Sequence, residues 1–230
     1  MKQFIHLLKL DFILLQRYKV IGISIALTAV YIAIFKGIAQ FGNTDKILIL
    51  LIFNDPALLG FLFTGVMILF EKNENTLQVL AVSPLKERNY ILSKTVSLTS
   101  ISLFCCCAMA SAAVGTNFNM VHYFFASVLT TGFFTFLGMI MVAGVNTFNR
   151  FILKSVGVLI LLSLPFLGYY ELLSRNWFLW MPTQACIDLF KASFEKNTTT
   201  MQIIYGYVAA ILWTVVTYLY ALRLLTKNLN

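Results

Sequence analysis

Charged residues are scarce in this sequence. They make up 11% of its 230 residues and hydrophobic residues 60%, against about 25% and 45–50% in ordinary soluble proteins. A soluble fold of this size cannot bury so much apolar surface, and the mean hydropathy of +0.84 indicates that the surrounding solvent is lipid. The 17 Lys and Arg residues outnumber the nine Asp and Glu residues, but they stand between apolar runs instead of clustering as on a nucleic-acid-binding face. The composition predicts an integral membrane protein with no nucleic-acid partner.

Residues suited to catalysis are also lacking. No glycine-rich phosphate loop of the form GxxxxGK[ST] occurs, so the chain has no recognisable nucleotide site. His6 and His122 fall on opposite predicted sides of the membrane and cannot share a metal ion. Cys105, Cys106 and Cys107 point in three directions, because a helix turns by about 100° per residue, which favours buried packing residues. We expect neither catalytic residues nor a metal or cofactor site in this chain.

Long uncharged runs locate the membrane spans. Residues 95–149 contain no Asp, Glu, Lys or Arg. Because one crossing takes about 20 residues, this stretch must hold two helices, divided at the polar residues 116–119. The runs lack the alternation of a transmembrane β-barrel. The sequence predicts an all-α, polytopic membrane protein with six transmembrane helices, at roughly 20–41, 47–70, 94–115, 121–146, 152–171 and 202–225.

The N-terminal segment differs from the spans. Its polar side chains share one arc of a helical wheel and its apolar side chains lie mostly opposite, although Asp11 interrupts the pattern. This predicts an amphipathic helix over residues 1–19, either lying in the membrane interface or packed on the bundle, followed by a transmembrane domain over residues 20–230. Most Lys and Arg residues fall on cytoplasmic segments if the N-terminus lies inside. Both termini are therefore expected in the cytoplasm.

The segment over residues 71–94 joins the second and third predicted spans and is the most informative part of the sequence. Glu71 and Glu74 follow directly on a span, and a short amphipathic stretch comes next. Ser83 before Pro84 is a helix-start signal, because the hydroxyl caps free amides and proline fits the first helical position. The segment suits docking into a groove on a partner protein, and a solvated connector explains it equally well.

The same segment resembles the E-x-x-[GN]-T-L-x-x-L-x-[VT]-[TS]-P-L…K region of ABC-2 type permeases. The resemblance covers the whole chain in length, helix layout and N-terminal helix, and residues 54–60 and 90–94 look most like the drug-export, fluoroquinolone-exporter-like branch. Asn75 stands where the family usually has Gly, and Asn also tolerates left-handed backbone. The resemblance implies ATPase-coupling residues at Glu71, Glu74, Thr76, Leu77, Gln78, Leu80, Ser83, Pro84 and Lys94.

The resemblance also implies a function. Such permeases pair as homodimers or heterodimers, and each half sits on a separate ATP-binding subunit, which binds ATP and Mg²⁺. The implied protein is a multi-pass permease subunit in the cytoplasmic membrane of a bacterial cell. It would export hydrophobic or amphipathic compounds such as drugs, lipids or peptides, with residues 71–83 docked on the ATP-binding subunit. The alternative is a non-transporting scaffold, or an immunity or assembly factor, of the same architecture.

Asp55 is the carboxylate predicted well inside a span boundary. An intramembrane acid indicates a site for a cation or a proton, whereas Asp55 before Pro56 also fits a helix cap that would begin the second helix. Pro165 is expected to kink the fifth span. By family analogy the second and fifth spans line the substrate path. The candidate substrate contacts are Asn54, Asp55, Phe61, Phe63, Pro165 and Phe166.

The outer loop over residues 171–200 is the longest predicted stretch between spans. Trp177 and Trp180 favour the depth of the membrane interface. Pro182 is a helix-start signal. The sequence therefore predicts a short helix that begins at Pro182 and lies at the outer interface. The family resemblance implies that this helix caps the exit, and a lipid-surface anchor is the alternative.

Overall fold

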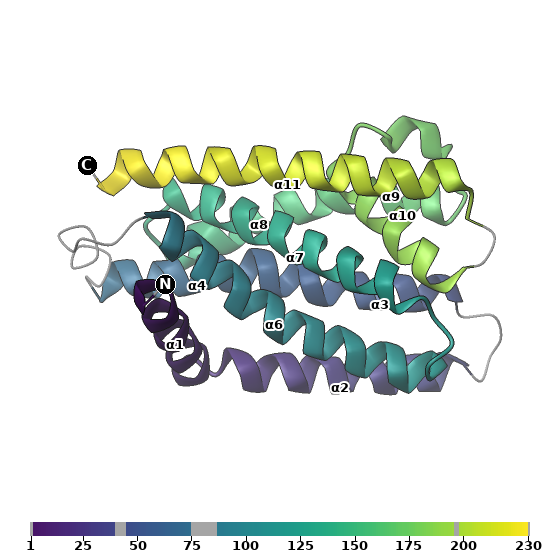
Figure 1. The fold of residues 1–230 in the computed structure, drawn as a ribbon, viewed down its shortest axis with the longest axis horizontal. Helices are drawn as coiled ribbons and strands as arrows, with labels where there is room; N and C mark the ends of the chain where they lie inside the picture. The colour runs from purple at the N-terminus through teal and green to yellow at the C-terminus, as the bar shows by residue number, and fades with distance from the viewer. Residues whose placement is uncertain (1, 40–44, 75–86, 196–197, 230) are drawn as a thin grey trace.

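The computed structural model describes residues 2–39, 45–74, 87–195 and 198–229, and all regular structure within these ranges is helical (Figure 1). Six stretches in this part of the chain are long and apolar enough to cross a membrane, which confirms the predicted number. The spans consist of α2 (Val20–Ala39), α3 (Asp45–Ala57) with the π-helix η1 (Leu58–Phe63) and α4 (Thr64–Asn73), α6 (Glu87–Val114), α7 (Met120–Ala143), α8 (Phe148–Ser163) with α9 (Pro165–Tyr169), and α11 (Thr200–Leu229).

The third span begins earlier than predicted. Helix α6 starts at Glu87 and has 28 residues, a length of about 42 Å at 1.5 Å per residue. This exceeds the roughly 30 Å of the hydrocarbon core. The first turns of α6 therefore project beyond the core, as expected for a helix that begins outside the membrane and continues into it.

Helix α1 (Lys2–Arg17) lies across the end of the bundle at a steep angle to the spans (Figure 1). It packs against α6 and α2. Leu7, Asp11 and Leu15 are buried, whereas Ile13 is 64% exposed and turns away from the bundle. The helix therefore combines the two predicted arrangements, because one face packs on the bundle and exposed apolar side chains remain available to lipid.

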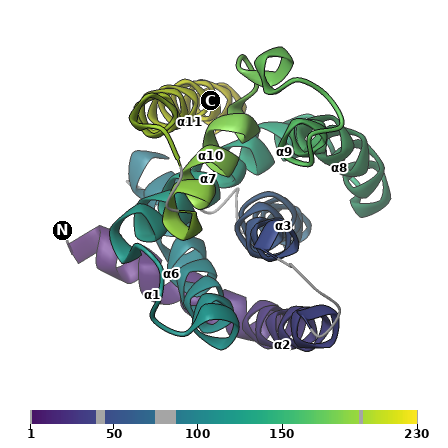
Figure 2. The ribbon, with the colours of Figure 1, turned by 90° about the vertical axis from the view of Figure 1, so that its right-hand side faces the viewer.

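Three spans lie at the periphery of the bundle. In the end-on view of Figure 2, α2, α8 and α11 occupy outer positions around α3 and α7. Their outer faces carry exposed aliphatic side chains, including Val30 on α2, Leu153 on α8 and Val208 on α11. Such faces are stable in lipid, where apolar side chains carry no penalty for exposure.

Helix α7 forms the centre of the bundle and packs against α11, α10, α6 and η1. Two glycines bring α7 and η1 into close approach. A Cβ atom on Gly60 would lie 2.8 Å from the Thr131 backbone oxygen, and one on Gly138 would lie 2.5 Å from the Phe61 backbone oxygen. Because both neighbours are backbone atoms, a larger residue at either position would force the helices apart.

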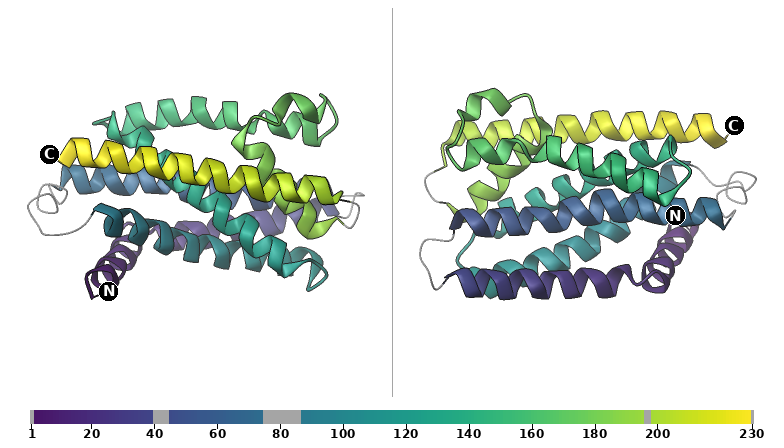
Figure 3. Two further views of the ribbon diagram at one scale, coloured as in Figure 1. Left: turned by 45° about the horizontal axis from the view of Figure 1, so that its top comes forward. Right: turned by 180° about the vertical axis from the view of Figure 1, so that it is seen from behind.

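Helix α10 (Pro182–Phe194) begins at the predicted residue, and its burial contradicts the interpretation as a lipid-surface anchor. Its residues from Pro182 to Phe190 are buried, and it packs between α7, α11 and α3. Figure 3 shows the green segment that contains it at the end of the bundle away from both termini. Its side chains, rich in Leu, Ile, Phe and Ala, therefore close that end of the core from within.

Buried polar contacts hold this outer segment. The 3-10 helix η2 (Arg175–Phe178) places Arg175 beside Asp188 of α10, with Nη2 2.7 Å from Oδ2. Gln184 donates a further hydrogen bond to Asp188. Burial raises the pKa of the Asp188 carboxyl above its ordinary value, and the hydrogen bond from Arg175 opposes that rise. These contacts fix α10 against the segment that precedes it.

Candidate drug site and coupling end

A cavity of about 240 Å³ lies between the second and fifth spans. Its walls come from α3 and the start of η1 on one side and from α8 and α9 on the other, and Phe134 of α7 contributes a ring. On the second span these residues lie between Leu50 and Leu58, in the half of the span remote from Asn73. The cavity therefore lies within the membrane, in the half of the bundle away from the termini.

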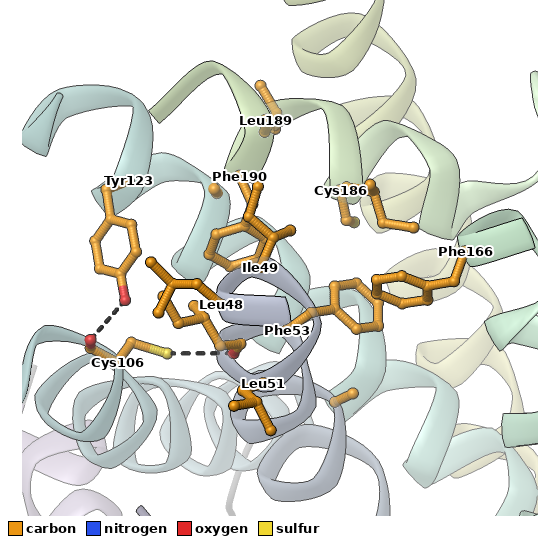
Figure 4. Packing of buried hydrophobic residues seen from close by; sticks show 14 of the residues in the cluster. Leu48, Ile49, Leu51, Phe53, Cys106, Tyr123, Phe166, Cys186, Leu189 and Phe190 are labelled. Carbon is orange, nitrogen blue, oxygen red and sulfur yellow. Dashed lines mark hydrogen bonds between the residues drawn. The ribbon is translucent and has the colours of Figure 1, made fainter. Parts of the chain in front are cut away.

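Both spans depart from regular α-helix beside the cavity. Pro56 lies inside α3 and has no N–H group to donate to the Ile52 carbonyl four residues earlier. The Cys106 thiol of α6 points at that carbonyl instead, with Sγ 4.0 Å from the oxygen (Figure 4). The π-helix Leu58–Phe63 follows at once. On the other side, α8 ends at Ser163 and α9 begins at Pro165, so the helix is interrupted where the kink was predicted. Such irregular turns are frequent at functional sites.

Aromatic rings form the inner wall of the cavity. The Phe53 ring lies 5.2 Å from the Phe166 ring and 5.8 Å from the Phe134 ring, edge to face in both pairs. Figure 4 shows Phe53 of α3 and Phe166 of α9 pointing toward one another across the gap between their helices. Edge-to-face pairs of this kind are favourable, and their faces suit an aromatic ligand.

Asn54 supplies the polar group at the cavity from the second span. It is half-buried, and its Nδ2 donates a hydrogen bond to the Leu50 carbonyl at 3.2 Å. One N–H and the amide oxygen have no hydrogen bond within the described part of the chain. On the opposite wall the Ser163 hydroxyl donates to the Ile160 carbonyl at 2.8 Å, which leaves its oxygen as an acceptor.

Asp55 points away from the cavity. Its side chain is buried, and Oδ2 accepts a hydrogen bond from the Thr28 hydroxyl of α2 at 3.2 Å. Helix α3 runs without interruption from Asp45 to Ala57, so the interpretation of Asp55 as a helix cap is wrong. Residues 47–53 belong to the same helix, which therefore begins well before Asp55.

The other candidate substrate contacts are distributed around the cavity. Phe166 lines it, and Pro165 is buried at the helix break beside it. Phe61 packs on the Phe134 and Phe151 rings behind the wall. Phe63 faces the cluster between α1, α4 and α6 and does not reach the cavity.

A buried polar network joins three helices at the end of the bundle that carries both termini. Lys94 of α6 is 0% exposed, and its Nζ lies 3.1 Å from Asp11 Oδ1 of α1 and contacts Glu71 Oε1 of α4. The Tyr90 hydroxyl donates to Glu71 Oε2 at 2.6 Å, and the Ser93 hydroxyl donates to Asp11 Oδ2. Each carboxylate oxygen has a donor, which is the condition under which buried charges are tolerated.

This network corrects the expectation that Glu71 contacts the partner subunit. Glu71 is 2% exposed, so its carboxylate is used inside the chain and is not offered to a partner. Lys94 lies in the same network. Asp11 was not predicted to belong to such a network, although it is the acid that interrupts an otherwise amphipathic pattern.

Glu74 keeps the exposure that a docking residue needs. It pairs with Arg17 at the end of α1, with 3.5 Å between Nη2 and Oε1, and both side chains are exposed to solvent. The neighbouring Lys72 turns the other way and donates to the Val142 carbonyl at the end of α7. The predicted coupling residues that lie outside the described part of the chain are Thr76, Leu77, Gln78, Leu80, Ser83 and Pro84.

The cysteines and histidines form no metal site in the part of the chain that the structure describes. No three His, Cys, Asp or Glu side chains gather there as metal ligands. Cys105 and Cys106 are buried, whereas Cys107 is exposed on the lipid-facing side of α6. The interpretation as buried packing residues is therefore correct for two of the three.

Comparison with known proteins decides the family. A sequence model of the fluoroquinolones export permease protein family matches residues 2–229. The chain belongs to this family. Proteins described as fluoroquinolones export permease proteins, from two strains of Mycobacterium tuberculosis, are each 28% identical to it over 143 residues. That match covers 62% of this chain and 60% of each relative, so it spans less than two thirds of the curated relatives.

Family membership fits a multi-pass permease with a site between its spans. The resemblance to drug-export permeases in residues 54–60 falls on the segment that contains Asn54 and the start of η1. Phe53 and Phe134 complete the wall in this permease. Phe53 was not among the candidate substrate contacts, because nothing in the sequence distinguishes it from the other aromatic residues of the apolar runs.

Proposed function

We propose that this chain is the membrane-spanning subunit of an ATP-driven exporter that moves hydrophobic or amphipathic drugs out across the cytoplasmic membrane of a bacterial cell. A separate subunit would bind ATP and Mg²⁺ and hydrolyse the nucleotide. Fluoroquinolones are the first compounds to test, because the relatives are described as exporting them.

The observation that carries this proposal is the cavity between the second and fifth spans. It combines three aromatic rings with the Asn54 amide at membrane depth, beside a π-helix and a proline break. Mostly apolar pockets with a few polar groups are the usual form of small-molecule sites. Helix irregularities on both walls give the spans places at which they can bend to take up and release a ligand.

The size of the cavity supports a second permease chain as partner. Its volume of about 240 Å³ is below the roughly 300–1,000 Å³ typical of drug sites. A second copy of this chain, or a related permease, facing the same two spans would enlarge and close the site. We infer that the working exporter contains two permease chains.

The buried network supports a route for coupling to ATP hydrolysis. Glu71 lies at the start of residues 71–83, the segment proposed to dock on the ATP-binding subunit, and Lys94 follows that segment. Lys94 pairs with Glu71 and also with Asp11 of α1. Because the three charges are buried and hydrogen-bonded, α1, α4 and α6 would move together when the segment is displaced. Rigid-body motion of packed helices is one of the ways in which such closure is transmitted.

Co-purification tests the proposal. The tagged chain is isolated from its native membranes in mild detergent, and co-eluting proteins are identified by mass spectrometry. We expect an ATP-binding subunit with a phosphate loop, and a second permease if the pair is a heterodimer. Glu74→Arg combined with Leu77→Asp should remove the ATP-binding subunit from the eluate and abolish fluoroquinolone export from cells.

A matched control is the charge reversal Glu171→Arg at the opposite end of the bundle, where Glu171 is exposed. This variant should retain the ATP-binding subunit. Elution of the wild-type chain without any ATPase, together with unchanged drug sensitivity of cells that lack it, would overturn the proposal in favour of a scaffold.

A further inference from the structure

The walls of the cavity between the second and fifth spans are uncharged. Every side chain that lines it in the described chain is aromatic, aliphatic, amide or hydroxyl. The neighbouring acid Asp55 directs its carboxylate to Thr28 on α2, away from the cavity. A ligand that entered with a net charge would lose its hydration without gaining a partner of opposite charge, which is strongly unfavourable.

The aromatic rings favour a flat ligand. The Phe53 ring stands edge to face with the Phe166 ring at 5.2 Å and with the Phe134 ring at 5.8 Å, and all three rings line the cavity, where a flat ring can join the cluster. Offset stacking and edge-to-face contact are the arrangements that aromatic groups prefer. The gap between α3 and α8 therefore suits a planar aromatic compound better than a bulky aliphatic one.

The Asn54 amide gives this apolar site its polar recognition. One amide N–H is used by the Leu50 carbonyl, and the remaining N–H and the amide oxygen can bond a carbonyl or an N–H group on the edge of a ligand. A site built to hydrogen-bond a ligand discriminates against an analogue that lacks the group, because its polar atoms are then left unpaired.

We propose that Asn54 is the specificity-determining residue of this cavity, and that the cavity takes planar aromatic compounds that enter without net charge and carry a carbonyl or N–H group. The inference rests on the proposed function, because it names the compounds that the drug site accepts. Asn and Asp have the same shape, so the identity of this one residue sets whether a cation or a neutral molecule is preferred.

Two tricyclic dyes provide the test. Acridone is planar and neutral and carries one carbonyl and one N–H; 10-methylacridinium has the same ring system, a permanent positive charge and neither group. Equilibrium binding of each dye to the full chain in lipid nanodiscs is followed by fluorescence at pH 8. The wild type should bind acridone about tenfold more tightly than methylacridinium.

Substitutions at residue 54 then separate shape from charge. Asn54→Leu should weaken acridone binding about tenfold and leave methylacridinium binding unchanged. Asn54→Asp should reverse the preference, because it places a carboxylate in the cavity without a change of shape. The matched control Asn149→Asp, at an exposed position at the start of α8, should bind both dyes like the wild type. Thermal unfolding of each variant verifies that it is folded.

The outcomes distinguish this inference from the proposed function. Equal binding of both dyes by the wild type, binding of neither, or a dye preference that Asn54→Asp leaves in place would each overturn the role of Asn54. Fluoroquinolone export from cells is measured separately with the same variants. Export that persists in those cases keeps the proposed function and rejects only the specificity assignment.

Discussion

Lys94 is the cation on which the end of the bundle near the termini depends. The substitution Lys94→Met keeps most of the volume of the side chain and removes its charge. Asp11 and Glu71, which are 3% and 2% exposed, would then share a buried site without a cation. We expect this change to be among the most destabilising single substitutions in the chain.

The burial of the two acids determines how much stability Lys94→Met should cost. Removal of one partner of a buried ion pair costs about 3–5 kcal/mol, because the remaining charge is left uncompensated. Two carboxylates lose their cation here, although each keeps one hydrogen bond, from Tyr90 to Glu71 and from Ser93 to Asp11. We therefore expect a loss of about 3–5 kcal/mol in the free energy of unfolding, and release of α1 from α6.

Equilibrium unfolding in mixed detergent micelles measures this loss. Lys154→Met at an exposed position on α8 is the matched control and should change the free energy of unfolding by no more than about 0.5 kcal/mol. The triple variant Asp11→Asn, Glu71→Gln and Lys94→Met removes all three charges and should recover most of the loss. The reasoning is refuted if Lys94→Met behaves like Lys154→Met, or if the triple variant is no more stable than the single one.

Three further predictions follow from local geometry. Gly138→Ala places a Cβ atom 2.5 Å from a backbone oxygen of the second span and should lower the free energy of unfolding by about 1–3 kcal/mol. The control Gly22→Ala has open space around the new Cβ atom and should not lower the stability of the protein. Asp55→Asn should leave drug export from cells unchanged, because this side chain faces the first span; lost export would show that Asp55 acts on the substrate or on a proton. The hydrogen bond and charge of Lys46 hold the pKa of the exposed Glu171 carboxyl below its ordinary value. The pair should therefore persist to a lower pH than an unpaired glutamate would allow, and be lost as pH falls through the lowered pKa. An NMR titration should show this low midpoint and its rise to the ordinary value in Lys46→Met.

The number and approximate position of the spans could be predicted from the sequence, because a charge inside the hydrocarbon core is too costly to occur often. The uncharged runs therefore mark the spans directly. The end of a span is less certain, as the start of α6 at Glu87 shows, since a helix can continue into water once it has formed. The choice between a cap and a lipid-surface anchor for α10 could not be made from the sequence, because its apolar composition suits burial in the bundle as well as the membrane surface.

The candidate site could be predicted only in part. Asn54 and Phe166 were found through the family resemblance, and the structure places both on one cavity. Glu71 and Lys94 stood out as charges next to spans, but their mutual contact and their contact with Asp11 bring together residues far apart in the sequence. No local pattern encodes such pairing, so exposed docking charges and buried paired charges look alike in a sequence.

The class of protein, the six membrane crossings, the amphipathic first helix and the break at Pro165 follow from the sequence alone, because hydrophobicity and proline geometry act locally along the chain. The direction in which neighbouring side chains face depends on how the helices pack. Asn54 and Asp55 are adjacent, yet one lines the cavity and the other bonds α2, because successive residues on a helix are separated by about 100°. Because α3 packs between α2 and α8, that rotation directs Asn54 to the cavity and Asp55 to Thr28 on α2.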